Sequence, residues 1–496
     1  MKIFSVPQIR AWDAYTIAHE PITSLKLMER ASEAFVQRFC SRFDKEQTIK
    51  VICGIGNNGG DGLAIARLLI QQHYNVQVYI LKINSLGSAD FEANLSRLKL
   101  LTTINWIETI TDFPRISPND EVIDALLGSG LSRPTQGIFA EVIEAINESG
   151  ATVCSVDIAS GLFSGSSNTP DDIIIKPTFT ISFQTPKLVF FQPQLAEYVG
   201  DWQTVNIGLH PVFENATDTS YFFTTQTLIE NISPAQKRKK YAHKGNFGHA
   251  LLIGGSFGKI GAMVLSAKAC LRSGVGLLTV QIPRCGYDIL QTSLPEAMVL
   301  SDWHWMVNTT VEDISTYSAI GVGPGLGKDP LTLAMLKELL PKITQPLVLD
   351  ADALNLISEN PDLLDIVPQN TILTPHPKEF RRLLGKDWKN DFEKLDLLRG
   401  FAQKYQVIVC LKGAHTAVAL PNGEIHFNST GNPGMATGGS GDVLTGIITG
   451  LLAQGFPPHE VAIFGVYQHG KAGDKAADKC TQPALIASDI INEMGW

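Results

Sequence analysis

The sequence lacks several features that would assign it to a particular class of protein. Its seven cysteines are scattered along 496 residues without a C-x-x-C pair, so we expect neither a structural zinc site nor a disulfide framework. No hydrophobic run reaches the roughly 18 residues that a membrane-spanning helix needs, and the N-terminus lacks the long apolar core of a signal peptide. We therefore expect a soluble cytoplasmic protein with no membrane partner.

Positive charge is also scarce. The formal net charge is −9, with 40 Lys and Arg against 49 Asp and Glu, which argues against binding to nucleic-acid phosphates. The 44% hydrophobic and 18% charged content is ordinary for a globular protein, and the length exceeds what a single core serves. A polar, turn-rich stretch separates two predicted domains, 1–215 and 225–496.

Strands and helices alternate in both predicted domains. In the first, a strand at 50–53 leads into a glycine-rich loop at 54–62 and a helix at 63–72, and further strands are predicted at 120–126 and 152–157. This alternation indicates an α/β fold, with helices on both faces of a parallel sheet. We predict two three-layer α/β/α domains, in which ligands bind outside the carboxyl ends of the strands.

Polar residues follow the strands of the first domain. Asn58, Asp124, Asp157 and Ser160 all fall at strand ends, close to a second glycine-rich turn at 128–134. A capping or turn role explains any one of them well but all four together poorly. Oxygen-bearing side chains that converge at one sheet edge can hold a hard cation or transfer protons.

A glycine-rich segment at 431–442 runs directly into an apolar helix of the second domain. The free N–H groups at a helix start suit phosphate binding. Asp442 lies at this junction, where its charge would repel phosphate, so we expect it to accept a proton or to organise a metal. The alternative is an ordinary Asp N-cap.

Two sets of motifs give the sequence a specific resemblance. In the second half these motifs are Gly323-Pro-Gly-Leu-Gly, Asp350-Ala-Asp-Ala-Leu, Thr374-Pro-His-Pro-Lys-Glu-Phe, Lys412-Gly-Ala-His-Thr and Thr437-Gly-Gly-Ser-Gly-Asp, and they resemble the ribokinase-like, ADP-dependent NAD(P)H-hydrate dehydratases. In the first half Gly56-Asn-Asn-Gly-Gly-Asp-Gly, Asp124-Ala-Leu-Leu-Gly-Ser-Gly-Leu and Val156-Asp-Ile-Ala-Ser-Gly resemble the NAD(P)H-hydrate epimerases. Nearly the whole chain therefore resembles the bifunctional nicotinamide nucleotide repair proteins.

For the first half, the resemblance implies a Rossmann-like epimerase domain that binds a potassium ion. K⁺ would be bound by Asn58, Asp124 and Ser160, while Asp157 would contact the altered ring and act in acid–base exchange at C6. Ser129 stands where relatives commonly carry threonine, which keeps the hydroxyl. The implied binding residues for the hydrated dinucleotide are Asn57, Asn58, Gly59, Gly60, Asp61, Gly128, Ser129, Gly130, Leu131, Ser132, Arg133, Pro134 and Asp157.

For the second half, the resemblance implies a dehydratase that uses ADP with Mg²⁺. Asp442 would take the proton of the 6-hydroxyl group of the hydrate, and the phosphate transferred to that oxygen would then leave. The implied hydrate site is Ala262, Gly325, His376 and Asp442, and the implied nucleotide site is Lys412, Gly413, Ala414, His415, Thr416, Gly438, Gly439, Ser440 and Gly441. The preference for ADP over ATP follows from the bifunctional layout and not from any residue.

Several alternatives stay open at this point. The chain can be a small-molecule kinase, acting on a hydroxymethylpyrimidine or a sugar, fused to a nucleotide-binding domain, or its first half can bind a nucleotide or a protein without catalysis. Taken singly, Lys412 and Arg133 read as surface charges and His376 as a turn cap. The apolar stripes between residues 9 and 39 indicate core or subunit contacts, and we expect a homo-oligomer.

Overall fold

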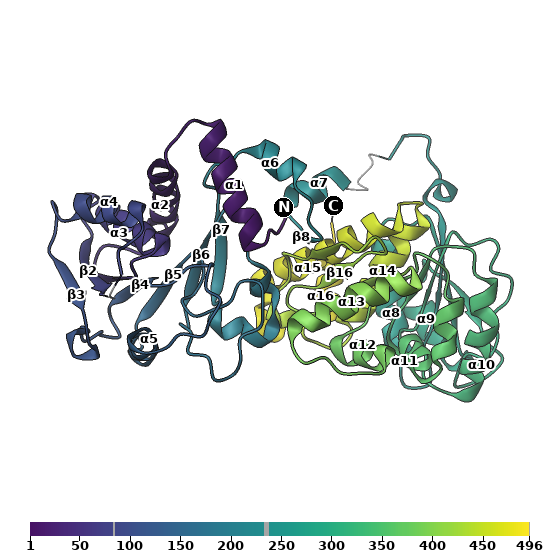
Figure 1. Ribbon diagram of the computed structural model, residues 1–496. Helices are drawn as coiled ribbons and strands as arrows, with labels where there is room; N and C mark the ends of the chain where they lie inside the picture. Colours follow the sequence, from purple (N-terminus) through teal and green to yellow (C-terminus); the bar gives the residue numbers. More distant parts are fainter. Residues whose placement is uncertain (83–84, 233–237, 496) are drawn as a thin grey trace. The chain divides into compact units, whose positions relative to one another are not determined.

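The computed structural model describes residues 1–82, 85–232 and 238–495 (Figure 1). The chain forms two compact units. The N-terminal unit comprises Lys2–Thr219 with Asn390–Phe392, and the C-terminal unit comprises Met1, Ser220–Lys389 and Glu393–Trp496. Within the described ranges, no helix is both long and apolar enough to cross a membrane.

The N-terminal unit is built on a parallel sheet of seven strands. Their order is β3-β2-β1-β4-β5-β6-β7, so the order reverses direction between β1 and β4. Loops that follow these two strands diverge to opposite sides and leave a crevice at the carboxyl end of the sheet. The strands are β1 (Thr48–Cys53), β2 (Asn75–Leu81), β3 (Ile104–Ile107), β4 (Glu121–Ala125), β5 (Thr152–Val156), β6 (Phe179–Phe183) and β7 (Asp201–Val205).

Helices cover both faces of this sheet. Alternate strand residues point to opposite faces, so Val51 of β1 packs into one core with Phe35 and Leu63, while Ile52 packs into another with Ile143. The helices are α1 (Val6–His19), α2 (Ser24–Cys40), α3 (Asn57–Gln71), α4 (Ala89–Leu98), α5 (Ile138–Glu148) and α6 (Pro211–Ala216). The short 3₁₀ turns are η1 (Ile110–Asp112), η2 (Leu188–Phe191) and η3 (Pro193–Tyr198).

The predicted loop at 54–62 is wrong in its second half, because α3 begins at Asn57. The sequence suggests that the glycines of this loop are turn residues. In the structure they instead allow the helix to pack closely against the strands. A Cβ on Gly59 would lie 1.8 Å from the carbonyl oxygen of Gly54, and one on Gly62 would lie 2.5 Å from the Cβ of Ala125. The glycines therefore let the helix start directly on the sheet edge.

The C-terminal unit is built on a mixed sheet of ten strands in the order β11-β10-β9-β12-β13-β14-β15-β16-β17-β8. The strands from β11 to β15 are parallel, whereas β16 pairs antiparallel with both of its neighbours. The strands are β8 (Tyr221–Phe223), β9 (His249–Ile253), β10 (Leu277–Ile282), β11 (Met298–Ser301), β12 (Ala319–Val322), β13 (Leu347–Leu349), β14 (Ile372–Leu373), β15 (Ile408–Leu411), β16 (Ala417–Ala419) and β17 (Ile425–Phe427). The predicted range 225–496 omits β8, which is a strand of this sheet.

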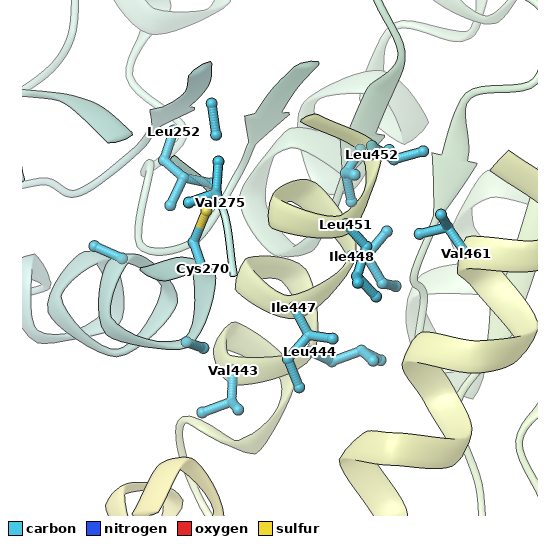
Figure 2. Packing of buried hydrophobic residues seen from close by; sticks show 14 of the residues in the cluster. Leu252, Cys270, Val275, Val443, Leu444, Ile447, Ile448, Leu451, Leu452 and Val461 are labelled. Atoms are coloured by element: carbon cyan, nitrogen blue, oxygen red, sulfur yellow. The ribbon is translucent and has the colours of Figure 1, made fainter. Parts of the chain in front are cut away.

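Helix α14 (Ser440–Ala453) lies in the main core of this unit. Figure 2 shows Ile447 and Leu451 of α14 between Cys270 of α8 (Ile260–Arg272) and Val461 of α15 (Pro458–Cys480). The other helices are α7 (Gln226–Ile232), α9 (Tyr287–Ser293), α10 (Pro330–Leu339), α11 (Ala351–Glu359), α12 (Pro377–Leu384), α13 (Asp391–Tyr405) and α16 (Ala487–Asn492). The 3₁₀ turns are η4 (Lys244–Phe247), η5 (Arg284–Gly286), η6 (Leu340–Lys342), η7 (Pro361–Ile366), η8 (Pro433–Met435) and η9 (Gln482–Ala484). The predicted fold class, two three-layer α/β/α domains, is confirmed.

Glycines let α14 approach α8 closely. We therefore expect alanine to reduce stability at a glycine of this contact and to increase stability at an exposed helical glycine elsewhere. A Cβ on Gly446 would lie 2.1 Å from the carbonyl oxygen of Ser266, whereas one on Gly400 of α13 would meet nothing within 4 Å. We expect Gly446→Ala to lower the free energy of unfolding by about 1–3 kcal/mol, because backbone must move. Gly400→Ala should raise it by about 0.5–1 kcal/mol. Urea unfolding of both variants checks this, and a tolerated Gly446→Ala would contradict the close packing.

Candidate functional site

The crevice of the N-terminal unit is a cavity of about 500 Å³ at the ends of β1 and β4. Eight of the residues predicted to bind there line it, namely Asn57, Asn58, Asp61, Gly128, Ser129, Gly130, Leu131 and Asp157. The other five, Gly59, Gly60, Ser132, Arg133 and Pro134, are not among its lining residues. The sheet topology explains the convergence, because the loops after β1 and β4 meet where the strand order reverses.

The three predicted potassium ligands lie together around Leu127. The Asn58 amide donates to the Leu127 carbonyl oxygen at 3.2 Å, and the Ser160 hydroxyl lies 3.2 Å from that oxygen and accepts from the Leu127 N–H at 2.8 Å. Asp124 accepts from the Ser160 N–H at 2.9 Å and from the Ser155 hydroxyl at 2.8 Å. Burial raises the pKa of Asp124, and these hydrogen bonds partly oppose that rise.

Asp157 follows β5 in a left-handed backbone conformation, with φ +67°. Such a conformation is costly for a residue with a Cβ and is most often found at functional sites. Its Oδ1 accepts from three donors, the Lys187 Nζ at 2.6 Å, the Phe183 N–H at 3.0 Å and the Ser182 hydroxyl at 3.2 Å. The Lys187 side chain is only 2% exposed, so this is a buried ion pair.

Lys187 and Asp13 line the same cavity but were not predicted from the sequence. Lys187 follows β6, a strand that was not predicted, so its position at a strand end was the missed signal. Asp13 lies on α1 within an apolar stripe that was interpreted as core or contact surface, and the pattern around it gave no signal. Burial and the charge of Asp157 raise the pKa of Asp13 to about 6, although Lys187 opposes this. Burial, Asp157, Asp13 and Asp90 hold the pKa of Asp61 well above its usual value.

The C-terminal unit has a cavity of about 750 Å³ beside the N-terminus of α14. Of the predicted nucleotide-binding residues, Lys412, Gly413, Ala414, Thr416, Ser440 and Gly441 line it, while His415, Gly438 and Gly439 do not. Of the predicted hydrate site, only His376 lines it. Gly325 lies next to Ala262, since a Cβ on Gly325 would be 3.2 Å from the Ala262 Cβ.

Helix α14 presents unpaired donors at its start. In the described part of the chain, the N–H groups of Gly438, Gly439 and Gly441 have no hydrogen-bond acceptor from the protein. The N-cap of α14 is Gly439, with φ +90°, so the alternative of Asp442 as N-cap is wrong. Burial and the neighbouring Asp350 raise the pKa of Asp442 to about 7, although Lys412 opposes this. Asp442 can therefore exchange a proton near neutral pH.

An ion pair between the half-buried Lys412 and the buried Asp350 lies beside Asp442. The Lys412 Nζ is 3.0 Å from the Asp350 Oδ1, and the Asp350 Oδ2 accepts from the Thr445 hydroxyl of α14 at 2.8 Å. Burial disfavours the charged form of Lys412, but Asp350 and other carboxylates outweigh it and raise its pKa. Lys412 is therefore a half-buried, ion-paired cation at the cavity and not a free surface charge.

His376 caps helix α12, as the alternative interpretation proposed. Its Nδ1 accepts from the N–H groups of Lys378 at 3.1 Å and Glu379 at 3.2 Å, and Glu379 accepts from the His376 N–H at 2.8 Å. The capping fixes the imidazole at the wall of the cavity. Burial and Lys412 lower the pKa of His376, which keeps the ring neutral near pH 7.

Comparison with known proteins gives matches to both halves of the chain. The family described as NAD(P)H-hydrate dehydratase matches residues 250–494, and the family described as YjeF-related protein N-terminus matches residues 24–189. A bifunctional NAD(P)H-hydrate repair enzyme of Moorella thermoacetica is 34% identical over 99% of this chain and 96% of its own length. The chain belongs to the family of bifunctional NAD(P)H-hydrate repair enzymes. This membership confirms the resemblance found in the motifs.

Other relatives cover the chain to a similar extent. The repair enzyme of Coxiella burnetii is 34% identical over 95% of this chain and 94% of its own length. Among solved structures, an ADP/ATP-dependent NAD(P)H-hydrate dehydratase of Bacillus subtilis, co-crystallized with ATP and Mg²⁺, is 30% identical with a TM-score of 0.49. That likeness covers 55% of this chain and 96% of the other.

The raised pKa of Asp442 predicts a pH-dependent effect on stability. The folded carboxyl ionises near pH 7 and the unfolded one near 3.8, so the folded state loses stability as pH rises between these values. Asp442→Asn should therefore raise the free energy of unfolding by about 2 kcal/mol near pH 8 relative to its effect near pH 5. Urea unfolding at both pH values measures this. Asp478→Asn, an exposed carboxylate of α15, is the control and should show no such difference.

Proposed function

We propose that this chain repairs hydrated nicotinamide dinucleotides in two reactions. The N-terminal unit interconverts the R and S forms of NAD(P)H hydrate. The C-terminal unit dehydrates the S form to NAD(P)H while ADP is converted to AMP and phosphate. Family membership over both halves supports this proposal and disfavours a fused small-molecule kinase.

One observation carries the dehydratase proposal: Asp442, whose pKa is raised to about 7, follows directly on the donor-rich start of α14. In a group transfer of this kind, the base acts on the attacking oxygen, while the phosphate-binding helix start holds the phosphate that this oxygen attacks. Asp442 takes the proton of the 6-hydroxyl group, and that oxygen attacks the terminal phosphorus of the nucleotide. The C6–O bond then breaks as the ring nitrogen donates its electron pair, and loss of a C5 proton restores the ring double bond.

We place the nucleotide site at the N-terminus of α14 and at the neighbouring turn 412–416. The N–H groups of Gly438, Gly439 and Gly441 would bind the transferring phosphate, and Lys412 would stabilise its charge. The His415 Nδ1–H donates to the Asn428 carbonyl oxygen at 3.0 Å and so fixes the turn 412–416. Asp350 and Asp352 are the nearby carboxylates that would hold a Mg²⁺ ion, which would offset the negative charge of the nucleotide phosphates. The hydrate is proposed to bind at Ala262, Gly325, His376 and Asp442, as the motifs imply.

The potassium site is proposed around Leu127 in the N-terminal unit. The residues there fit a monovalent cation, because the available ligand atoms of Asn58, Asp124, Ser160 and Leu127 are all oxygens. The Asp124 carboxylate is buried, and no ion pair to it is found among the described residues. A bound cation would offset the cost of burying this charge.

The proposed activities are tested with the full chain and a mixture of R and S hydrates of NADH, with ADP, Mg²⁺ and K⁺. We expect complete conversion to NADH, measured by its absorbance. Asp442→Asn should lower the rate of S-hydrate dehydration by about 10²–10⁴-fold, since the general base is lost. A stable phosphorylated product in place of NADH would support the kinase alternative instead.

The pH dependence of the dehydration rate in the same assay tests the assignment of Asp442 as the base. Because Asp442 must be ionised to accept a proton, the wild-type dehydration rate should fall as pH falls through about 7. The control variant Asp478→Asn should keep both the rate and the pH profile. A wild-type level of dehydration by Asp442→Asn would contradict the assignment of the base.

The potassium site predicts a cation-dependent epimerase. Conversion of purified R hydrate into S hydrate, followed by chromatography, should fall at least severalfold when K⁺ is replaced by Li⁺, since the smaller ion cannot span the same oxygens. Ser160→Ala should weaken the response to K⁺ and Glu144→Gln, an exposed carboxylate of α5, should not. Equal rates in K⁺ and Li⁺ would contradict the proposed site.

A further inference from the structure

The N-terminal cavity holds more ionisable groups than binding alone requires. Three carboxylates, Asp13 on α1, Asp61 on α3 and Asp157 after β5, line it together with Arg10 and Lys187. They come from segments far apart in the sequence. No role has been given above to Asp13 or Lys187.

Lys187 and Asp157 form a fixed pair. The Lys187 Nζ contacts the Asp157 Oδ1 at 2.6 Å, the Ser182 hydroxyl at 3.0 Å and the Thr185 carbonyl oxygen at 3.3 Å, which occupies the three protons of its ammonium group. Because its donors are used within the protein, Lys187 positions Asp157 and has none left for a substrate. The second carboxylate oxygen of Asp157 lies outside this set of hydrogen bonds.

Backbone strain accompanies this pair. Asp157 has φ +67° and Gln184, which also lines the cavity, has φ +60°. Both stand just after a strand, where a glycine would be the usual residue for such a conformation. Strain of this kind persists where the surrounding structure fixes a functional geometry.

Asp13 differs from Asp157 in its surroundings. It is half-buried at the cavity wall, and in the described part of the chain no hydrogen bond or ion pair holds its carboxylate. Burial and the charge of Asp157 raise the pKa of Asp13 to about 6. The groups that face it are Arg10 of its own helix, Asp61, Asp157 and Lys187. Two carboxylates with different environments, one paired with a lysine and one without an ion pair in the described part of the chain, can form an acid–base pair.

We propose that Asp13 is the proton donor of the epimerase, that Asp157 is its base, and that Lys187 positions Asp157. This proposal rests on the epimerase function proposed above. Asp13 protonates the 6-hydroxyl oxygen, the C6–O bond breaks to release water, and the ring nitrogen forms a C=N bond with C6. Water then adds to the opposite face of C6 and gives a proton to Asp157. One proton has passed from Asp13 to Asp157, and exchange with solvent restores the starting state. The reverse epimerisation uses the two carboxylates in exchanged roles.

The test follows purified R hydrate with the full chain and leaves out ADP, so that only epimerisation is observed. We expect Asp13→Asn to lower kcat by about 10²–10⁴-fold with KM changed by less than about threefold, and Asp13→Glu to recover most of the rate. Glu33→Gln, which removes an exposed carboxylate of α2 outside the cavity, should match the wild type. Normal epimerisation by Asp13→Asn would overturn the proposal.

The pH profile and isotope labelling provide independent readouts. The wild-type rate should fall as pH rises through about 6, because Asp13 must be protonated, and Asp13→Asn should lack this fall. Lys187→Met should shift the acidic limb of the profile to higher pH, and Lys187→Arg should restore it. In H₂¹⁸O each inversion should place one ¹⁸O at C6. Inversion without label, or an unshifted acidic limb in Lys187→Met, would overturn the proposed steps.

The experiments distinguish failure of the proposed epimerase function from failure of the assignment of Asp13. Dehydration of S hydrate with ADP reports on the C-terminal unit of the same variant, and it should stay at the wild-type rate in every Asp13 and Lys187 variant. If the wild-type chain does not epimerise R hydrate, the proposed function of the N-terminal unit fails. If the wild type and Asp13→Asn epimerise equally well, only the assignment of Asp13 fails.

Discussion

Each unit pairs one lysine with one aspartate at the carboxyl end of its sheet. In the N-terminal unit the pair is Lys187 and Asp157, and in the C-terminal unit it is Lys412 and Asp350. Buried ion pairs of this kind contribute little to stability, because desolvation offsets much of the attraction. Their effect here is on a neighbouring carboxylate. Asp13 and Asp442 lie near these pairs without a cation of their own, and the pKa of each is raised toward neutrality.

In both units, two neighbouring carboxylates have different roles. One carboxylate is neutralised by the lysine and acts as a fixed part of the site. The other is left in a poorly solvated place where it can gain or lose a proton at the pH of a cell. The seven parallel strands of the C-terminal sheet, in the order β11-β10-β9-β12-β13-β14-β15, repeat the strand order of the N-terminal sheet, so the two units share this topology as well as the electrostatic feature.

Much of the architecture followed from the sequence, because strand–helix alternation and glycine-rich strand ends are local signals. Asn58, Asp124 and Ser160 were identifiable as a group since the carboxyl ends of parallel strands must meet at one edge. The start of α3 at Asn57 was not identifiable, because glycines that allow close packing look the same as glycines that make turns. Asp13 was missed for another reason. Its role depends on a helix being placed over a sheet edge formed much later in the chain, and no spacing rule records that placement.

The strand β8 has a consequence for the way in which the second half of the chain can exist alone. Tyr221, Phe222 and Phe223 pair in parallel with β17 and form the outermost strand of the ten-stranded sheet. Without them, the Ile425–Phe427 strand would present unpaired backbone groups and apolar side chains along an open edge, which is a template for aggregation. A fragment beginning at residue 225 would therefore lose its protective border, whereas one beginning at residue 220 would keep it.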